Sequence, residues 1–93
     1  MSATPAETET EIWNRTIQPE NGNLPLAAAR AWLELKLSPG DRERINELSA
    51  NAREGTLTAA EEQELDNYLN VGRALELLKA KARCSLERTA APA

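Results

Sequence analysis

The sequence predicts an all-α fold: a small bundle of about four helices, with a long C-terminal helix and a tight helix–corner–helix at Gly55–Thr58. Two observations carry this prediction. Apolar residues recur at intervals of three and four positions through most of the chain, which is the spacing of one buried helix face. Helix breakers separate these segments, namely "PENGN" at 19–23, "SPGD" at 38–41 and the glycine at 55. A chain of 93 residues makes one domain, which we expect at 10–88 between disordered tails at 1–9 and 89–93.

The first helix is expected from Thr10 to Gln18, where the turn signal begins. Its apolar residues have helical spacing and are expected to face the core: Ile12, Trp13 and Ile17. The second helix contains "LAAARAWLELK" and starts near Asn23–Pro25, since proline is tolerated in a first turn.

The third helix has a clear start and a clear end. Ser38 can cap it, Pro39 takes the first helical position, and Asp41 lies near the positive end of the helix dipole. Gly55 ends it, because glycine adopts the left-handed conformation that follows a last turn. One face is expected to be buried, comprising Ile45, Leu48 and Ala52.

The stretch "GTLTAAE" resembles the second half of a calcium-binding loop, with Gly55 and Glu61 at the corresponding positions. In such a loop Ala50 and Ala52 would occupy positions that need oxygen-bearing side chains, so we expect no calcium site. Thr58 and Glu61 instead have the spacing of a capping box. A helix therefore ends at Gly55 and another begins directly after Thr58.

The fourth helix is expected from Ala59 to Leu86, about 40 Å at 1.5 Å per residue. Its apolar positions form two stripes, the first with Leu65, Leu69, Gly72 and Leu75, the second with Val71, Leu75, Leu78 and Ala82. A helix that is apolar on two sides packs against two neighbours, or against its own domain and a partner. Gly72 lowers helix stability by about 1 kcal/mol relative to alanine, so we expect a close helix crossing there or, as the alternative, a slight kink.

The composition argues against an enzyme. The chain has no histidine, the commonest general base and transition-metal ligand, and Cys84 is its single cysteine. We therefore predict no catalytic, cofactor-binding or metal-binding residues. No apolar run approaches the length of a membrane span, and the N-terminal segment lacks the pattern of a secretion signal. We expect a cytoplasmic protein without membrane contact.

The net charge of −4 is unevenly distributed. Residues 1–66 hold 13 acidic and 6 basic side chains, whereas residues 67–93 hold 2 acidic and 5 basic ones. The candidate acidic face comprises Glu43, Glu47, Glu54, Glu62 and Asp66. The segment "LKAKARCSLER" combines an apolar line with cations, and its candidate partner-binding residues are Leu78, Lys79, Lys81, Ala82, Arg83 and Leu86. Cations at this end also suit the helix dipole, which is a purely structural explanation.

Residues 37–83 resemble a family of small, mostly uncharacterised, acidic α-helical bacterial proteins. The matching motifs are Arg-x-x-x-Leu (Arg44–Leu48), Gly-x-Leu-Thr (Gly55–Thr58), Glu-Leu-x-x-Tyr (Glu64–Tyr68) and Lys-Ala-Arg (Lys81–Arg83), preceded by a similar Leu26–Arg30 segment. Members of that family are often encoded just ahead of an HNH-type or other small nuclease, as in antitoxin and toxin pairs. The resemblance implies an accessory or neutralising partner of a nuclease, and it carries no catalytic residue.

Three hypotheses follow. The leading one is a non-enzymatic protein that binds a nuclease and regulates it, covering the basic DNA groove of the enzyme with an acidic face. The second is a DNA-binding regulator that uses the basic end of the long helix, with Arg73, Lys79, Lys81, Arg83 and Arg88. The third is a structural module that self-associates through the second apolar stripe.

Overall fold

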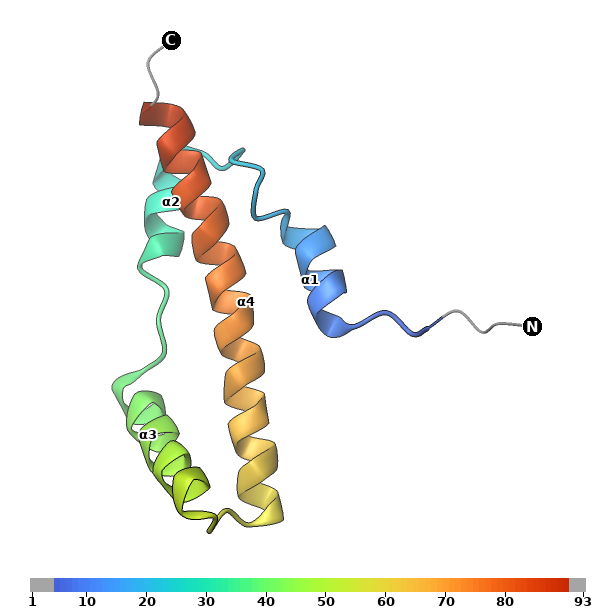
Figure 1. The fold of residues 1–93 in the computed structure, drawn as a ribbon. Helices are drawn as coiled ribbons and strands as arrows, with labels where there is room; N and C mark the ends of the chain where they lie inside the picture. Colours follow the sequence, from blue (N-terminus) through green and yellow to red (C-terminus); the bar gives the residue numbers. More distant parts are fainter. Residues whose placement is uncertain (1–4, 91–93) are drawn as a thin grey trace, which may run out of the picture. The chain divides into compact units, whose positions relative to one another are not determined.

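A computed structural model describes residues 5–90 as four helices joined by loops (Figure 1). The helices are α1 (Glu9–Ile17), α2 (Leu26–Leu33), α3 (Pro39–Glu54) and α4 (Ala59–Ala90). No strand occurs among these residues, so the predicted all-α class with a long C-terminal helix is confirmed. α4 continues four residues beyond the expected end at Leu86. The tails expected at 1–9 and 89–93 lie partly outside the described residues.

The chain divides into two compact units, each described by itself. The hairpin unit is Lys36–Arg73, with α3, the corner and the first part of α4. The terminal unit combines Met1–Leu35 with Ala74–Ala93, so it holds α1, α2 and the rest of α4. In the part of the chain that the structure describes, no helix combines the length and the apolar character needed to cross a membrane.

Local chemistry sets both ends of α3. The Ser38 hydroxyl oxygen accepts a hydrogen bond from the Asp41 N–H at 3.1 Å, and Pro39 occupies the first turn. At the other end Gly55 has a φ of 72°, and the Thr56 N–H donates to the Asn51 carbonyl at 2.9 Å. The left-handed glycine lets the chain turn while the last helical carbonyls keep their partners.

The corner between α3 and α4 is closed by the predicted capping box. The Glu61 N–H donates to Thr58 Oγ1 at 3.1 Å, and the Thr58 N–H donates to Glu61 Oε1 at 3.0 Å. Two of the four backbone donors that a helix start leaves unpaired are thereby satisfied. Gly55 to Thr58 is a stop followed by a start, as the sequence predicts.

The core of the hairpin unit is small and centred on Leu48, which is fully buried. Ile45 and Leu65 are half-buried. Three residues expected on buried faces or apolar stripes are exposed, namely Ala52, Leu69 at 49% and Val71 at 48%. The close crossing expected at Gly72 is also absent, since a Cβ built there meets no described atom within 4 Å.

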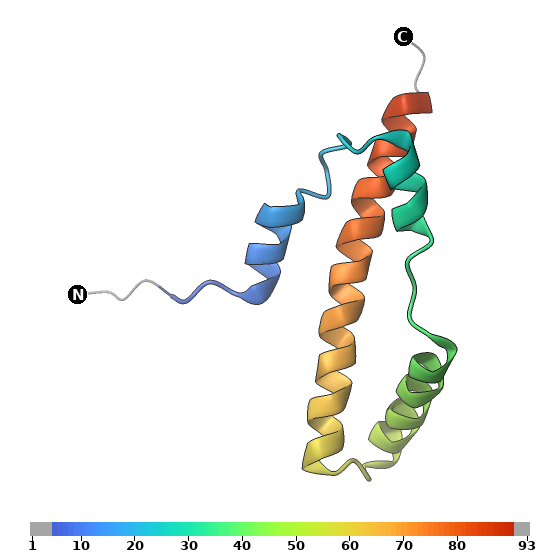
Figure 2. The ribbon, with the colours of Figure 1, turned by 180° about the vertical axis from the view of Figure 1, so that it is seen from behind.

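In the terminal unit, α2 lies beside the C-terminal part of α4 in both ribbon views (Figures 1 and 2). Ala29 of α2 and Ala82 of α4 are fully buried. The loop before α2 crosses α4 so closely that a Cβ on Gly22 would lie 2.7 Å from the Cys84 carbonyl oxygen. The Leu24 N–H donates to Ser85 Oγ at 3.1 Å in the same crossing.

α1 belongs to the terminal unit but has no buried residue. Ile12 is 46% exposed and Trp13 36% exposed, so the expectation that both face the core is wrong. Helical spacing identifies an apolar face but carries no information on what covers it. Only Ile17, the last residue of α1, is half-buried.

Candidate protein-binding surfaces

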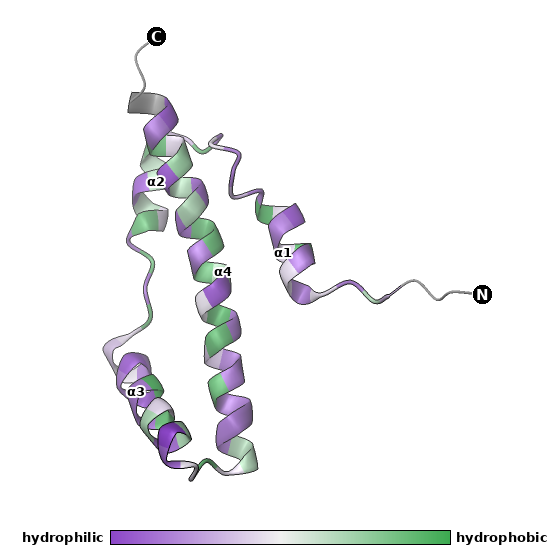
Figure 3. Ribbon diagram, viewed as in Figure 1, coloured by the Kyte–Doolittle hydropathy of each residue, from purple (hydrophilic) through white to green (hydrophobic). Residues whose placement is uncertain are grey.

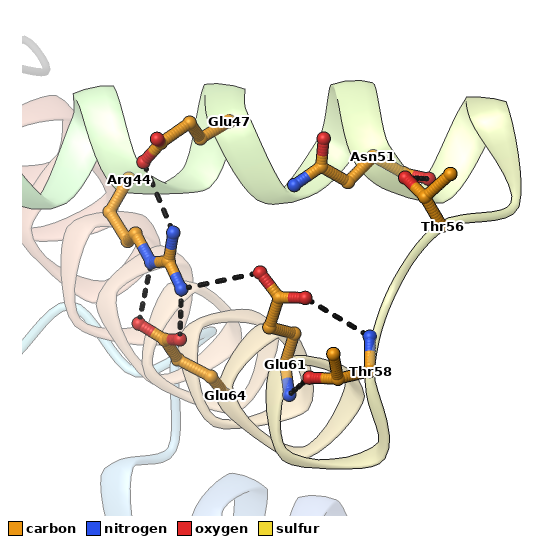
Figure 4. A network of polar contacts seen from close by, with 7 residues as sticks. All are labelled: Arg44, Glu47, Asn51, Thr56, Thr58, Glu61 and Glu64. Atoms are coloured by element: carbon orange, nitrogen blue, oxygen red, sulfur yellow. Dashed lines mark hydrogen bonds and ion pairs between the residues drawn. The ribbon is translucent and has the colours of Figure 1, made fainter.

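One arginine joins the two helices of the hairpin unit (Figure 4). Arg44 of α3 donates from Nε and Nη2 to the two carboxylate oxygens of Glu64 on α4, at 2.9 and 2.8 Å. Its Nη1 donates to Glu47 at 3.1 Å, and Nη2 lies 3.6 Å from Glu61. A planar guanidinium suits this two-pronged contact, because its donors match the spacing of carboxylate oxygens.

Charge and hydrogen bonding within this network shift several pKa values. The hydrogen bonds that Arg44 donates to Glu64, and then the one it donates to Glu47, raise the pKa of Arg44, and the bond from Arg44 lowers the pKa of Glu64. A second link joins the helices where the Tyr68 hydroxyl donates to Asp41 Oδ1 at 2.8 Å. That bond, followed by the one from Ser38, lowers the pKa of Asp41, and the Asp41 carboxylate raises the pKa of Tyr68.

The candidate acidic face draws on two helices, with one stripe of carboxylates on each. Glu43, Glu47 and Glu54 are spaced by four and seven residues, so they follow one flank of α3. Glu62 and Asp66 are four residues apart on α4. All five side chains are exposed.

Within residues 5–90 the two stripes differ in one respect: the α3 stripe includes a carboxylate that pairs with an arginine, and the α4 stripe does not. Among the described residues, only Glu47 of these five carboxylates makes an ion pair or side-chain hydrogen bond, and it does so with Arg44. The α3 stripe extends over twelve residues, 43–54, a rise of about 16 Å. In Figure 3 the ribbon of α3 is coloured as hydrophilic along much of its length, with shorter hydrophobic segments between. The hairpin unit as a whole carries eight acidic and five basic residues, a net charge of −3.

The structure places the basic segment of α4 in two different environments. Lys81 and Ala82 are buried within the terminal unit, so neither side chain is accessible to a partner. Arg83 is exposed and lies 3.7 Å from Glu76. Leu78, Lys79 and Leu86 are half-buried.

Lys81 has a structural partner that the sequence does not indicate. Its Nζ donates to the Ile17 carbonyl oxygen at 2.7 Å, at the C-terminal end of α1. An ammonium group at this position satisfies an unpaired carbonyl and suits the negative end of the helix dipole. One cation of the proposed DNA-binding set is therefore used within the fold.

Within the described residues, no group of three or more acidic or cysteine side chains is placed to hold a metal ion. Cys84 is a half-buried free thiol on α4. Compared with known proteins, the chain matches no family model, no curated protein and no solved structure.

Two features of these surfaces escape sequence reasoning. The bonds from Arg44 to Glu64 and from Tyr68 to Asp41 join residues 20 and 27 positions apart. The corner predicts a helical hairpin. It does not predict which charged side chains of the two helices face each other, because that depends on how each helix is rotated about its axis. The other feature that sequence reasoning missed is the exposed apolar stripe of α1, which the structure reveals through the exposure of Ile12 and Trp13.

Proposed function

We propose that this protein is a non-enzymatic interaction partner that binds a nuclease and regulates or neutralises it, using the acidic stripe Glu43, Glu47 and Glu54. The carrying observation is that these three carboxylates line one exposed flank of a helix in a unit of net charge −3. A nuclease that holds DNA needs cations to neutralise phosphates. A rigid row of carboxylates is complementary to such a groove and would compete with DNA for it.

The rigidity of the hairpin unit supports the same proposal. Arg44 ties α3 to α4, and the capping box fixes the corner. A surface that is ordered before binding loses less conformational entropy on association than a flexible one. The nuclease as partner is suggested by the family resemblance of residues 37–83, and we propose that the two proteins meet in the cytoplasm. The lack of histidine fits a partner without catalysis of its own.

The test is complex formation with an HNH-type or other small nuclease encoded next to this protein, which is the arrangement that the family resemblance leads us to expect. The two proteins are expressed together, separated by gel filtration, and the nuclease is assayed on duplex DNA with and without its partner. We expect co-elution, a changed rate of DNA cleavage, and binding that weakens as salt rises. Separate elution with an unchanged cleavage rate contradicts the proposal.

A set of variants identifies the stripe that binds. Replacing Glu43, Glu47 and Glu54 by glutamine is expected to weaken the complex at least about tenfold. Arg53→Gln is the matched control, because it changes an exposed charge of α3 outside the stripe and should leave binding unchanged or slightly tighter. The double variant Glu62→Gln with Asp66→Asn measures how much the α4 stripe contributes to binding.

A further inference from the structure

α1 presents an apolar stripe that the described chain leaves uncovered. Ile12 and Trp13 are exposed, and with Glu9 and Thr16 they line a shallow hollow of about 390 Å³ on this helix. The spacing of these four residues, at 9, 12, 13 and 16, puts them on one helix face. Tryptophan is among the residues that most often anchor protein interfaces.

The helix is stabilised without packing of this stripe. A nine-residue helix is marginal in water when it stands alone. Here Thr8 and Glu11 form a capping box, and Arg15 in the last turn pairs at 2.6 Å with Glu7, which precedes the helix. Lys81 holds the last turn through its bond to the main chain. α1 is therefore a preformed helix that displays an anchor residue, and it does not depend on its own apolar face for its structure.

Charge indicates what this stripe fits. Residues 7–17 contain three glutamates and one arginine, and the arginine is paired with Glu7. Glu9 lies in the hollow itself. A complementary surface is thus an apolar groove with lysines or arginines at its edge. A second copy fits less well, because both units carry net negative charge, −3 and −1. An anionic lipid surface is disfavoured for the same reason.

We propose that α1 is a docking helix, whose stripe of Ile12 and Trp13 inserts into an apolar groove edged by basic residues on a partner protein. Recognition of this kind, a helix in a groove, depends on apolar anchors at helical spacing and on charge at the rim. The inference goes beyond the proposed function: it concerns the terminal unit, and it holds whether or not the acidic stripe of α3 binds a nuclease.

The test uses Trp13 as its own reporter in the full chain. Trp32→Phe leaves Trp13 as the only tryptophan. The probe is a synthetic amphipathic helical peptide of leucine and lysine, which offers an apolar face edged by cations. We expect titration with this peptide to shift the Trp13 emission to shorter wavelength in a saturable manner. The same pattern built from leucine and glutamate should not shift it.

Two substitutions at Ile12 test whether the peptide binds to this stripe and not elsewhere on the protein. Ile12→Asp is expected to weaken peptide binding at least about tenfold, and Ile12→Gln, which adds no charge, by a smaller factor. Both replace a half-exposed side chain, so circular dichroism should show unchanged helix content. Leu69→Asp is the matched control, because Leu69 is equally exposed but lies in the hairpin unit, and it should leave binding unchanged.

Several results would overturn the inference. One is an unshifted Trp13 emission, and another is equal loss of binding in the Ile12 and Leu69 variants. A shift with vesicles containing phosphatidylserine would assign the stripe to a lipid surface. Dimers in sedimentation that Ile12→Asp abolishes would assign it to a second copy of the chain.

Discussion

Lys81 Nζ donates a 2.7 Å hydrogen bond to the carbonyl oxygen of Ile17, 64 positions earlier in the chain. This bond anchors the end of α1 on α4 inside the terminal unit. Next to it the Ser85 hydroxyl donates to the Lys81 carbonyl at 2.8 Å and accepts from the Leu24 N–H. A few polar contacts therefore position the N-terminal segment, where apolar burial is small.

Lys81→Met should loosen α1. The substitution keeps the aliphatic length but removes the ammonium group, so the Ile17 carbonyl loses its partner. Hydrogen bonds to charged groups contribute about 1.5–3 kcal/mol, and we expect a loss of stability in this range. Amide hydrogen exchange in α1 should become faster. Lys79→Met, two residues away and without a described hydrogen bond, should leave that exchange unchanged.

Gly22→Ala and Gly72→Ala should have effects of opposite sign. At Gly22 the new Cβ would meet main-chain atoms of Cys84 at 2.7–2.8 Å, and such overpacking destabilises by about 1–3 kcal/mol. At Gly72 the Cβ points into open space, and alanine in a helix interior stabilises by about 1 kcal/mol over glycine. Thermal unfolding of the two variants measures both. A stabilised Gly22→Ala protein would contradict the close crossing.

The capping box at the corner is tested by Thr58→Ala. Loss of the hydroxyl leaves the Glu61 N–H without its acceptor, which should cost about 1 kcal/mol in urea unfolding. Thr58→Ser keeps the acceptor oxygen and should retain most of the stability. Equal stability of the alanine and serine variants would show that the box contributes nothing.

Arg44→Gln should weaken the hairpin unit more than Arg53→Gln. Arg44 contacts carboxylates on both helices, whereas Arg53 is an exposed residue of the same helix with no described side-chain partner. We expect the midpoint of thermal unfolding to fall below that of the wild type in Arg44→Gln and to stay unchanged in Arg53→Gln. Similar midpoints for the two variants would mean that the inter-helix pair is not stabilising.

Stability should fall at both ends of the pH range. The pKa values of Glu64 and Asp41 are lowered from their ordinary 4.5 and 3.8. Their contribution is therefore present above those values and is lost as pH falls through the lower, folded-state pKa. The pKa of Tyr68 is raised above 10.0, so its contribution is present below that value and is lost at higher pH. Unfolding midpoints measured against pH in wild type and Tyr68→Phe test this; the variant should lose the alkaline decline.

Local signals in the sequence were sufficient for both ends of α3 and for the start of α4, but not for the ends of α2 and α4. Ser38 and Gly55 bound α3, and Thr58 starts α4, because caps act on the nearest few backbone groups. The backbone groups that these residues contact lie within three or four positions in the sequence, so a local sequence pattern is enough to identify them.

Contacts between distant residues were not predictable in the same way. The burial of Lys81 depends on Ile17, and the close approach at Gly22 depends on Cys84, both far away in the sequence. Helical periodicity likewise identified the apolar face that contains Ile12, but it did not show that this face is exposed. Such features depend on which faces meet, which propensity and spacing do not specify.

The most direct test of this account is amide chemical-shift mapping of the protein on titration with the nuclease. We predict that the largest shifts occur along α3 near Glu43, Glu47 and Glu54, and that they diminish in the variant with glutamine at these positions. Shifts confined to the basic end of α4, around Lys79 and Arg88, would contradict it.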